Sequence, residues 1–413
     1  MNQPPIFVVG VPRSGTTLLA AMLAAHSRLS CGPETHFFRR LQEVDARAFL
    51  EDPRWPQEAA RFICDISHST YAADAASSTS DGRTRLIDKY GLEEAAIADF
   101  LQGQPPSLAA MLASVTEQYM HRQGKVRWAE KTPDHLALVH LIRRLFPASP
   151  IVRIVRDPRD VAISLGRVPW GAQTLLEALF FWRRLDDASS AFFVADPNSY
   201  TLRYEDLITE PRQELQKLCR FLGEPYEEGM LDTSRTGRRI NARQVPWKDK
   251  VSQPIDSSRV GLWRGALTPA ENRLAEAILG DRLARYGYPQ EVHFNRLGEL
   301  FPDEVAAGRF QDAFTVLAGE GIRFWKAHPD ERPAVKIYLG NPGDAEWLGD
   351  HRLGRGLRAL SIAAGVVRNL ARPMALYWVP GQGQVQWPGY AAYLLQRLLT
   401  PYRVSAPPQR MPS

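Results

Sequence analysis

Cysteine is scarce in this chain of 413 residues, and long hydrophobic runs are missing from it. The three cysteines, Cys31, Cys64 and Cys219, are widely spaced, and none belongs to a CxxC pair. An odd number at such spacing excludes a disulfide framework and a thiolate zinc site. It favours a reducing compartment, so we expect a cytoplasmic protein.

No segment of the sequence is predicted to cross a membrane. The most apolar late stretch, residues 357–379, is interrupted by three arginines, an asparagine and a proline, which prevents it from spanning a bilayer. The first residues show no basic region followed by an apolar segment of signal-peptide length. We therefore expect no transmembrane segment and no signal peptide.

Neither positive nor negative charge is in large excess. The chain has 51 lysines and arginines against 46 aspartates and glutamates, a net charge of +5. This excess suits an anionic ligand, but no nucleic-acid motif or aromatic-interleaved basic patch accompanies it, so no nucleic-acid partner is expected. No histidines, cysteines and acids have the spacing of metal ligands, so no metal is expected.

Apolar runs alternate with helix-like segments through the first 290 residues. Residues 6–9 form a short apolar run that ends at Gly10, and residues 17–25 are predicted to be a helix. The same order returns at residues 151–156, followed by a predicted helix over 159–166. Further helices are predicted over residues 108–122, 135–146, 175–193, 212–222 and 269–286, with a strand over 199–204. This alternation predicts an α/β fold with a mostly parallel sheet flanked by helices.

The chain is predicted to divide near residue 290. Residues 1–290 form the first domain, residues 291–402 a mainly helical carboxy-terminal extension or small domain, and residues 403–413 a flexible tail with three prolines. Within the extension, helices are predicted over residues 294–317 and 353–370, and a strand over 335–339.

A glycine-containing turn connects the first strand to the first helix. Residues 10–17, GVPRSGTT, have the G-x-x-x-x-G spacing of a P-loop, in which backbone N–H groups and a helix N-terminus face an anion. A nucleotide triphosphatase has lysine directly after the second glycine, where this chain has Thr16. Arg13 can instead present its planar guanidinium to a tetrahedral anion. The alternative is a surface turn that uses glycine and proline only for its shape.

A second anion-binding segment is predicted where the strand over 151–156 ends. Arg156 ends the strand, and Ser164 lies about two turns into the next helix. Open α/β sheets bind ligands at the carboxyl ends of their strands, so these two side chains are expected to share one phosphate. Arg159 is expected to face solvent or an acidic neighbour.

Together these segments resemble the sulfotransferase superfamily that uses 3′-phosphoadenosine 5′-phosphosulfate (PAPS), with motifs closest to tyrosylprotein-sulfotransferase-like bacterial members. PRSGTT, residues 12–17, resembles the 5′-phosphosulfate loop, and VRDPRDVAIS, residues 155–164, resembles the 3′-phosphate motif. YEDL, from Tyr204, is similar to the strand-end segment near the adenine. SRVGLWR, residues 258–264, resembles the late basic loop over the nucleotide. The resemblance covers about residues 5–290 and implies a P-loop-like sheet.

The resemblance also implies how the nucleotide is held. The residues expected to bind it are Arg13, Ser14, Gly15, Thr16 and Thr17 at the 5′ end, Tyr204 near the adenine, and Arg156, Ser164, Arg259 and Arg264 at the 3′-phosphate. Arg259 and Arg264 are equally compatible with a plain surface loop. PAPS is then the co-substrate, 3′,5′-adenosine bisphosphate the product and a hydroxyl compound the acceptor, without a metal.

Glu34 is the predicted general base. Its segment CGPETH, residues 31–36, is similar to the Cys-Gly-Glu-Glu-Thr segment of tyrosylprotein sulfotransferases, whose second glutamate is the proposed base. Pro33 stands at the first glutamate, which weakens a peptide-tyrosine interpretation. His36 is the rival base, since cytosolic sulfotransferases of small phenols use histidine. Glu34 as a solvated loop acid or helix cap is the alternative.

Lys131 and Arg13 complete the predicted catalytic set. Lys131, in WAEKTP, residues 128–133, resembles the family's lysine that reaches the bridging oxygen as charge develops. The alternative is an ordinary surface ion pair with Glu130 or Asp134, which contributes little.

Three functions are consistent with these motifs. The first is in-line transfer of a sulfonate group from PAPS to a hydroxyl, with Glu34 as base. The second is an atypical P-loop kinase, disfavoured by Thr16, and the third is a non-catalytic nucleotide-binding protein. The motifs leave open a carbohydrate, lipid, peptide-tyrosine or small-molecule acceptor, and they leave the oligomeric state open.

Overall fold

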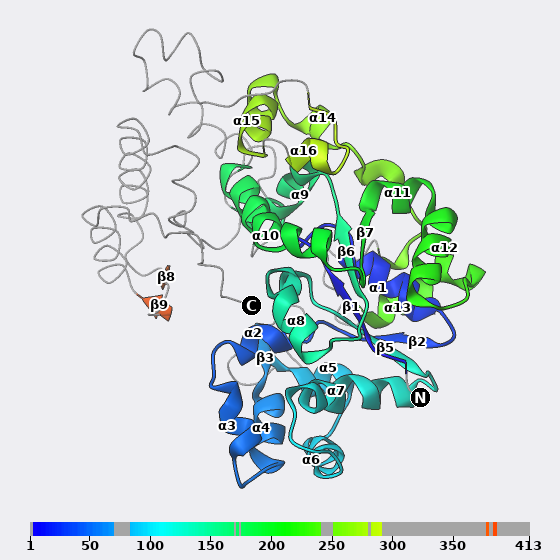
Figure 1. The fold of residues 1–413 in the computed structure, drawn as a ribbon. Coiled ribbons are helices and arrows are strands. Elements are labelled where there is room, and N and C mark those ends of the chain that lie inside the picture. The colour runs from blue at the N-terminus through cyan, green and yellow to red at the C-terminus, as the bar shows by residue number, and fades with distance from the viewer. Residues whose placement is uncertain are drawn as a thin grey trace. The chain divides into compact units, whose positions relative to one another are not determined.

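The structure is a computed structural model, drawn as a ribbon in Figure 1. It describes residues 3–69, 83–168, 171–172, 175–240, 251–279, 282–290, 377–379 and 383–385. The chain divides into two compact units, Met1–Val161 with Trp182–Arg264 and Ala162–Phe181 with Gly265–Ser413. The elements predicted between residues 294 and 370, and the tail, lie outside the described residues. The predicted boundary near residue 290 stays a prediction.

A five-stranded parallel sheet forms the centre of the first unit (Figure 1). Its strands are β1 (Ile6–Val9), β2 (Leu29–Cys31), β5 (Arg127–Lys131), β6 (Ile151–Val155) and β7 (Ser199–Arg203). They lie in the order β2-β5-β1-β6-β7, and every neighbouring pair is parallel. The predicted α/β fold with a parallel sheet is confirmed.

Helices surround this sheet in the first unit. They are α1 (Thr16–Ala25), α2 (Phe37–Leu41), α3 (Ala46–Glu51), α4 (Gln57–Asp65), α5 (Leu86–Tyr90), α6 (Glu94–Gln102), α7 (Leu108–Arg122), α8 (Val139–Leu145), α11 (Tyr204–Thr209), α12 (Pro211–Leu222) and α13 (Ser234–Ile240). Shorter 3₁₀ helices are η1 (Pro133–Leu138), η2 (Glu228–Leu231) and η4 (Ser257–Arg259), and β3 (Ser67–Ser69) pairs antiparallel with β4 (Arg83–Arg85). The helices α9 (Pro158–Leu165), α10 (Leu175–Ala195) and α14 (Trp263–Ala266) run across the boundaries of the unit.

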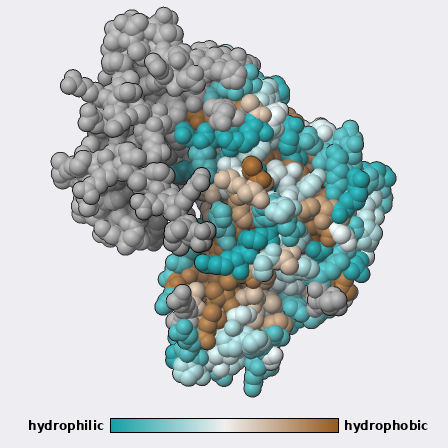
Figure 2. All heavy atoms as spheres, in the orientation of Figure 1, coloured by the Kyte–Doolittle hydropathy of each residue, from teal (hydrophilic) through white to brown (hydrophobic). Residues whose placement is uncertain are grey.

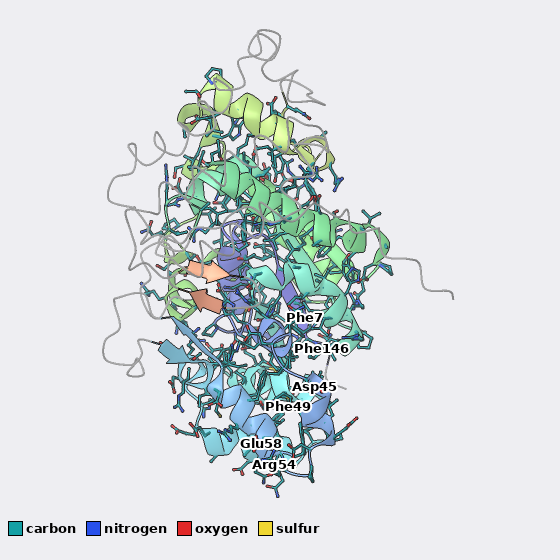
Figure 3. The ribbon with its side chains drawn as sticks, turned by 90° about the vertical axis from the view of Figure 1, so that its left-hand side faces the viewer. Phe7, Asp45, Phe49, Arg54, Glu58 and Phe146 are labelled. Atoms are coloured by element: carbon teal, nitrogen blue, oxygen red, sulfur yellow. The ribbon has the colours of Figure 1, made fainter. Side chains whose placement is uncertain are left out.

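The central strand β1 buries side chains on both faces of the sheet. Ile6 and Val8 belong to a core cluster formed with α1, α12 and α13. Phe7 packs in a separate aromatic group, with its ring centroid 4.9 Å from that of Phe146 and 5.9 Å from that of Trp128 (Figure 3). Because helices cover both faces, the strand is apolar throughout and is recognisable in the sequence.

Strand β5 is different, because three of its residues are charged, and an apolar run does not reveal it. Arg127, Glu130 and Lys131 are nonetheless buried. Arg127 donates to a carboxylate oxygen of Glu224 at 3.1 Å and to the carbonyl of Leu222 at 2.7 Å. Buried charges of this kind require partners, and the other two find theirs at the candidate site.

Two helices predicted as single segments are divided. The segment over 135–146 begins as η1 at Pro133 and continues as α8, and Leu138 between them has φ −115° and ψ 17°, outside the helical region. The segment over 269–286 forms α15 (Pro269–Leu279) and α16 (Arg282–Arg285). In the first case the hydrophobic period extends past the change of backbone conformation at Leu138.

The described part of the second unit contains α15, α16 and the antiparallel pair β8 (Tyr377–Val379) and β9 (Gly383–Val385). Thr268 and Glu271 cap the start of α15. The Thr268 N–H donates to the Glu271 carboxylate at 2.8 Å, and the Glu271 N–H donates to the Thr268 hydroxyl at 3.4 Å. This reciprocal capping box satisfies two N–H groups that the helix leaves open.

The surface of the described part is mixed in character. Figure 2 shows hydrophilic residues over most of the visible face, with small hydrophobic patches between them. Arg54 and Glu58, labelled in Figure 3, form one of the surface ion pairs at 2.9 Å. None of the helices in the described ranges is long and apolar enough to cross a membrane.

Candidate active site

The predicted site residues of the first unit gather where the parallel strands end. β1 leads into the turn that holds Arg13, β2 into the segment that holds Glu34, and β5 ends at Lys131. β6 is followed by Arg156, and β7 by Tyr204. Since all five strands are parallel, these carboxyl ends share one edge of the sheet, the usual ligand edge of such folds.

The turn after β1 is tightly packed against β6. A Cβ on Gly10 would lie 2.6 Å from the carbonyl oxygen of Ile154, so only glycine fits there. Gly15 adopts φ 96° at the N-cap of α1, and Arg13 has φ 76°, a left-handed conformation that non-glycine residues seldom adopt. The hydroxyl of Ser14 is buried without a hydrogen-bond partner. This turn directs α1's open N–H groups and an unused hydroxyl toward the same region.

Three arginines converge beside this turn. Arg156 donates hydrogen bonds to the carbonyls of Arg13, at 3.2 Å, and of Arg259, and its guanidinium lies 4.6 Å from the ring centroid of Tyr204. Its Nε atom is buried without a hydrogen-bond partner. Burial, followed by the charges of Arg156 and Arg259, lowers the pKa of Arg13 to about 10. Mutually repelling cations of this kind suit a ligand with several negative charges.

The late basic loop is fastened to the same place by Asp160. Its carboxylate accepts the N–H groups of Gly261, at 2.8 Å, and Trp263, at 2.9 Å. The same carboxylate lies 3.6 Å from Arg156. Arg264 is exposed, with its guanidinium 4.8 Å from the Trp263 ring centroid. The Asp160 contacts hold this loop, with Arg259, beside Arg156, and the sequence did not indicate them.

Arg159 is expected to face either solvent or an acidic neighbour, and the first alternative is wrong. It is fully buried, and its guanidinium pairs with the Asp157 carboxylate through contacts of 3.0 and 2.9 Å. The opposite face of the guanidinium lies 3.6 Å from the Trp263 ring centroid. The second alternative, an acidic neighbour, is confirmed by Asp157. Arg159 thus supports the late loop.

Glu34 and Lys131 form an ion pair. The Lys131 ammonium donates to Glu34 Oε1 at 2.5 Å, with the lysine side chain fully buried and that of Glu34 19% exposed. Tyr90 holds the preceding backbone, because its hydroxyl donates to the Pro33 carbonyl at 2.6 Å and its ring leaves no room for a Cβ on Gly32. A partly exposed carboxylate beside a buried cation stays ionised, as a general base requires.

A buried network lies under this pair. The Glu130 carboxylate accepts the hydroxyls of Thr35, at 2.7 Å, and Thr132, at 2.5 Å, and lies 3.2 Å from Nδ1 of His135. The Thr132 hydroxyl in turn accepts the N–H groups of Thr35 and His36. Burial alone would raise the pKa of Glu130, but His135 and these hydroxyls lower it. The network fixes the Glu34 segment to the end of β5.

His36 lies on the far side of Glu34 from Lys131. Its Nε2 atom is 3.5 Å from Glu34 Oε2, and its Nδ1 atom is 3.6 Å from Asp134 Oδ1. The histidine that the sequence names as a rival base is therefore a direct neighbour of the predicted base.

The remaining predicted residues lie on helices. Thr16 and Thr17 begin α1, where their N–H groups are among those the helix leaves open. Ser164 lies on α9 in the stretch that belongs to the second unit, and its predicted role stays a prediction. Across the described residues, no three His, Cys, Asp or Glu side chains are grouped so that they could hold a metal ion.

Sequence reasoning gave no role in the site to Tyr90, Glu130, Thr132, Asp134 and Asp160. It considered Glu130 and Asp134 only as surface partners of Lys131, which is instead buried and paired with Glu34. The sequence does draw attention to Glu130 and Thr132, because they flank Lys131 in the WAEKTP segment that resembles a family motif. Asp160 lies in the motif of residues 155–164, but that motif does not indicate its partners at Gly261 and Trp263, about a hundred residues further along the chain. Tyr90 is likewise 57 residues from the carbonyl it holds.

Two family models match the chain. The model described as "Sulfotransferase family" matches residues 4–228, and the one described as "Sulfotransferase domain" matches residues 181–287. Protein-tyrosine sulfotransferase 1 of Danio rerio is 24% identical over 73% of this chain and 77% of its own length. Nodulation protein NoeE of Sinorhizobium fredii is 24% identical over 89% of this chain and 88% of its own length. Among solved structures, the sulfotransferase domain of the Synechococcus PCC 7002 olefin synthase is 25% identical with a TM-score of 0.45, covering 68% of this chain and 96% of that domain.

Proposed function

Because the chain belongs to the PAPS-dependent sulfotransferase family, we propose that it transfers a sulfonate group from PAPS to a hydroxyl acceptor with Glu34 as general base. The observation that carries this proposal is the Glu34–Lys131 ion pair of 2.5 Å, at the sheet edge where the anion-binding turn ends β1. An acid and a cation in contact at this edge supply the two functions that the reaction needs.

The residues of the turn and of the arginine cluster, which is Arg13, Arg156 and Arg259, fit the nucleotide. Among the described residues, the buried Ser14 hydroxyl and the Arg156 Nε atom have no hydrogen-bond partner, and both suit phosphate or sulfonate oxygens. Arg13 with the N–H groups of residues 14–17 would hold the 5′ end, and Arg156 with Arg259 the 3′-phosphate. When bound, PAPS supplies an activated sulfonate and a phosphate leaving group.

The protein's own residues then divide the chemistry. Glu34 takes the proton from the acceptor hydroxyl as the new oxygen–sulfur bond forms, and ends protonated. Lys131 offers its ammonium to the oxygen that gains negative charge as the old sulfur–oxygen bond breaks. Arg13 holds the sulfonate-bearing end in line with the hydroxyl. The products are a sulfate ester and 3′,5′-adenosine bisphosphate.

The acceptor is proposed as a hydroxyl compound. The Danio rerio relative is named for protein tyrosine, but Pro33 stands at a position where the tyrosylprotein segment carries a glutamate. We also propose that the enzyme works in a reducing compartment such as the cytoplasm, which is supported by Cys31, Cys64 and Cys219 being buried free thiols.

We expect 3′,5′-adenosine bisphosphate to bind in the presence of excess EDTA, because arginines and helix N–H groups supply the positive field. The measurement is the rise in the protein's melting temperature as the ligand is added. ATP with Mg²⁺ is the comparison. A shift that disappears with EDTA, or a larger response to ATP with Mg²⁺, would favour the kinase alternative instead.

Arg156→Ala is expected to weaken bisphosphate binding roughly 10- to 150-fold, the value of a charge-assisted contact of about 1.5–3 kcal/mol. Arg156 also donates to the Arg13 carbonyl, so adenosine 5′-phosphosulfate should lose affinity as well, by a smaller factor. Titration calorimetry gives the dissociation constants of both ligands for the wild-type protein and the variant, and from them the fold-loss of affinity for each ligand.

The matched control is Arg153→Ala, which removes another buried arginine near the end of β6. Arg153 donates to the Thr201 hydroxyl at 3.2 Å and lies 4.2 Å from the Phe193 ring centroid, so this variant should lose stability and keep nucleotide affinity. Arg159→Ala is unsuitable, because that residue supports the late loop. Equal weakening of both ligands by Arg156→Ala would mean that Arg156 acts only through the turn.

A further inference from the structure

His36 stands between two carboxylates. Its Nε2 atom lies 3.5 Å from Glu34 Oε2 and its Nδ1 atom lies 3.6 Å from Asp134 Oδ1, both at ion-pair distance. All three side chains are partly exposed, at 24% for His36, 19% for Glu34 and 25% for Asp134. Each ring nitrogen therefore faces a carboxyl oxygen. While the carboxyl group is ionised, this oxygen can only accept hydrogen bonds.

This arrangement distinguishes the two protonation states of the ring. A neutral imidazole carries one N–H group, so its other nitrogen would turn a lone pair toward a carboxylate oxygen. An imidazolium carries two N–H groups and attracts both carboxylates. The geometry at His36 therefore matches the protonated form.

The surrounding charges act in the same direction. Burial alone would lower the pKa of His36, but Asp134 and Glu34 outweigh it and raise the pKa. Asp134 is itself kept ionised, since its pKa is lowered by His36, His135 and Arg39 against the effect of burial. Among the described residues, the titratable and charged groups that face His36 directly are Glu34 and Asp134, and those behind them include Lys131, Arg13, Arg39 and His135.

We propose that His36 is a positioning residue that works as an imidazolium, bridging Asp134 to the catalytic base and holding Glu34 in place beside Lys131. The proposal rests on the proposed function. Lys131 holds Oε1 of Glu34 and His36 lies beside Oε2, so Glu34 keeps one anchor when the lysine ammonium turns to the leaving oxygen. His36 then cannot be the rival base, because its nitrogens already carry their protons.

The backbone holds the ring in this position. His36 has φ 52° and its N–H donates to the Thr132 hydroxyl at 3.3 Å. The same hydroxyl is bound to Glu130. His36→Gln and His36→Lys both keep the N–H that donates to Thr132 and introduce no β-branched side chain, so these two variants are chosen to compare side chains on the same backbone.

The first test needs no activity. The nine histidines of the chain can be labelled and titrated by NMR, with the His36 signal assigned by its loss in His36→Gln. His36 should titrate above its ordinary pKa of about 6.5, and Asp134→Asn should lower that pKa by about one unit. The control Arg39→Gln removes an exposed partner of Asp134 and should leave the pKa near its wild-type value or slightly above it. Titration at or below the ordinary value, or no response to Asp134→Asn, would overturn the proposal.

The second test is the pH dependence of turnover. If the imidazolium is required, kcat should fall as pH rises through the raised pKa of His36, and Asp134→Asn should move this fall to lower pH. His36→Gln should lower kcat about tenfold, abolish the fall and leave nucleotide affinity unchanged, whereas His36→Lys should restore part of kcat without the fall. A profile that His36→Gln leaves unchanged would contradict the bridging role. Wild-type protein that transfers nothing would contradict the proposed function instead, and the NMR titration would still decide the state of His36.

Discussion

Glu34→Gln is expected to lower turnover by roughly two to four orders of magnitude, the range for loss of a general base. The amide keeps the shape of the side chain and still offers an oxygen to the Lys131 ammonium, which lies 2.5 Å from Oε1 in the wild-type protein. It cannot take the proton of an acceptor hydroxyl. Nucleotide affinity should change little, because the turn and the arginine cluster stay in place. Steady-state kinetics with PAPS as the varied substrate separates the two effects.

The control for this variant is Glu43→Gln, the same change at an exposed glutamate paired with Arg40 on the surface. It should leave turnover at the wild-type level. His36→Ala should be milder than Glu34→Gln, because it removes an anchor rather than the base. An inactive His36→Ala together with an active Glu34→Gln would show that the base is His36.

Lys131→Met is expected to lower kcat about 100- to 1000-fold, the cost of removing one positioned donor to a developing negative charge. Methionine has a similar length and suits a side chain that is fully buried, so the fold should persist. Glu34 keeps its contact with His36 and its partial exposure to water. The expected pattern is a loss in kcat with little change in the dissociation constant of 3′,5′-adenosine bisphosphate.

Lys125→Met provides the matched control, because Lys125 is another lysine whose ammonium is engaged inside the protein. It donates to the carbonyls of Ala24, in the last turn of α1, and Leu29, in β2, and these partners do not include Glu34. This variant should lose stability and keep kcat. If Lys131→Met reduced nucleotide affinity as strongly as kcat, the lysine would be a binding group rather than one that acts at the transition state.

Much of the fold and of the nucleotide-binding edge could be predicted from the sequence. β1 is a continuous apolar run and β6 is apolar except for Arg153, because both faces of the sheet are covered, and each strand is followed by a turn with a recognisable pattern. The turn around Gly15 and the position of Arg156 follow directly from that order. Glu34 and Lys131 were found through the family resemblance, and the structure brings them into contact.

The support of the site could not be predicted in the same way. Strand β5 carries buried charges whose partners lie elsewhere in the sequence, such as Glu130 with Thr35, 95 residues away. Asp160 satisfies backbone N–H groups of a loop more than a hundred residues away, at Gly261 and Trp263. Glu130 and Asp160 lie in recognisable motifs, but these motifs do not indicate their distant partners, so only the folded chain reveals the contacts.

Transfer of a sulfonate group by this protein can be measured with PAPS that carries a radiolabel on its sulfur. Wild-type protein and Glu34→Gln would be incubated in excess EDTA with carbohydrate, lipid, tyrosine-peptide and phenol acceptors, and labelled sulfate esters would be counted. We predict a labelled ester with at least one acceptor class for the wild-type protein, lowered by roughly two to four orders of magnitude in the variant. If the wild-type protein binds PAPS but forms no labelled ester with any acceptor, sulfonate transfer is contradicted. If Glu34→Gln forms as much labelled ester as the wild-type protein, the role of Glu34 as base is contradicted.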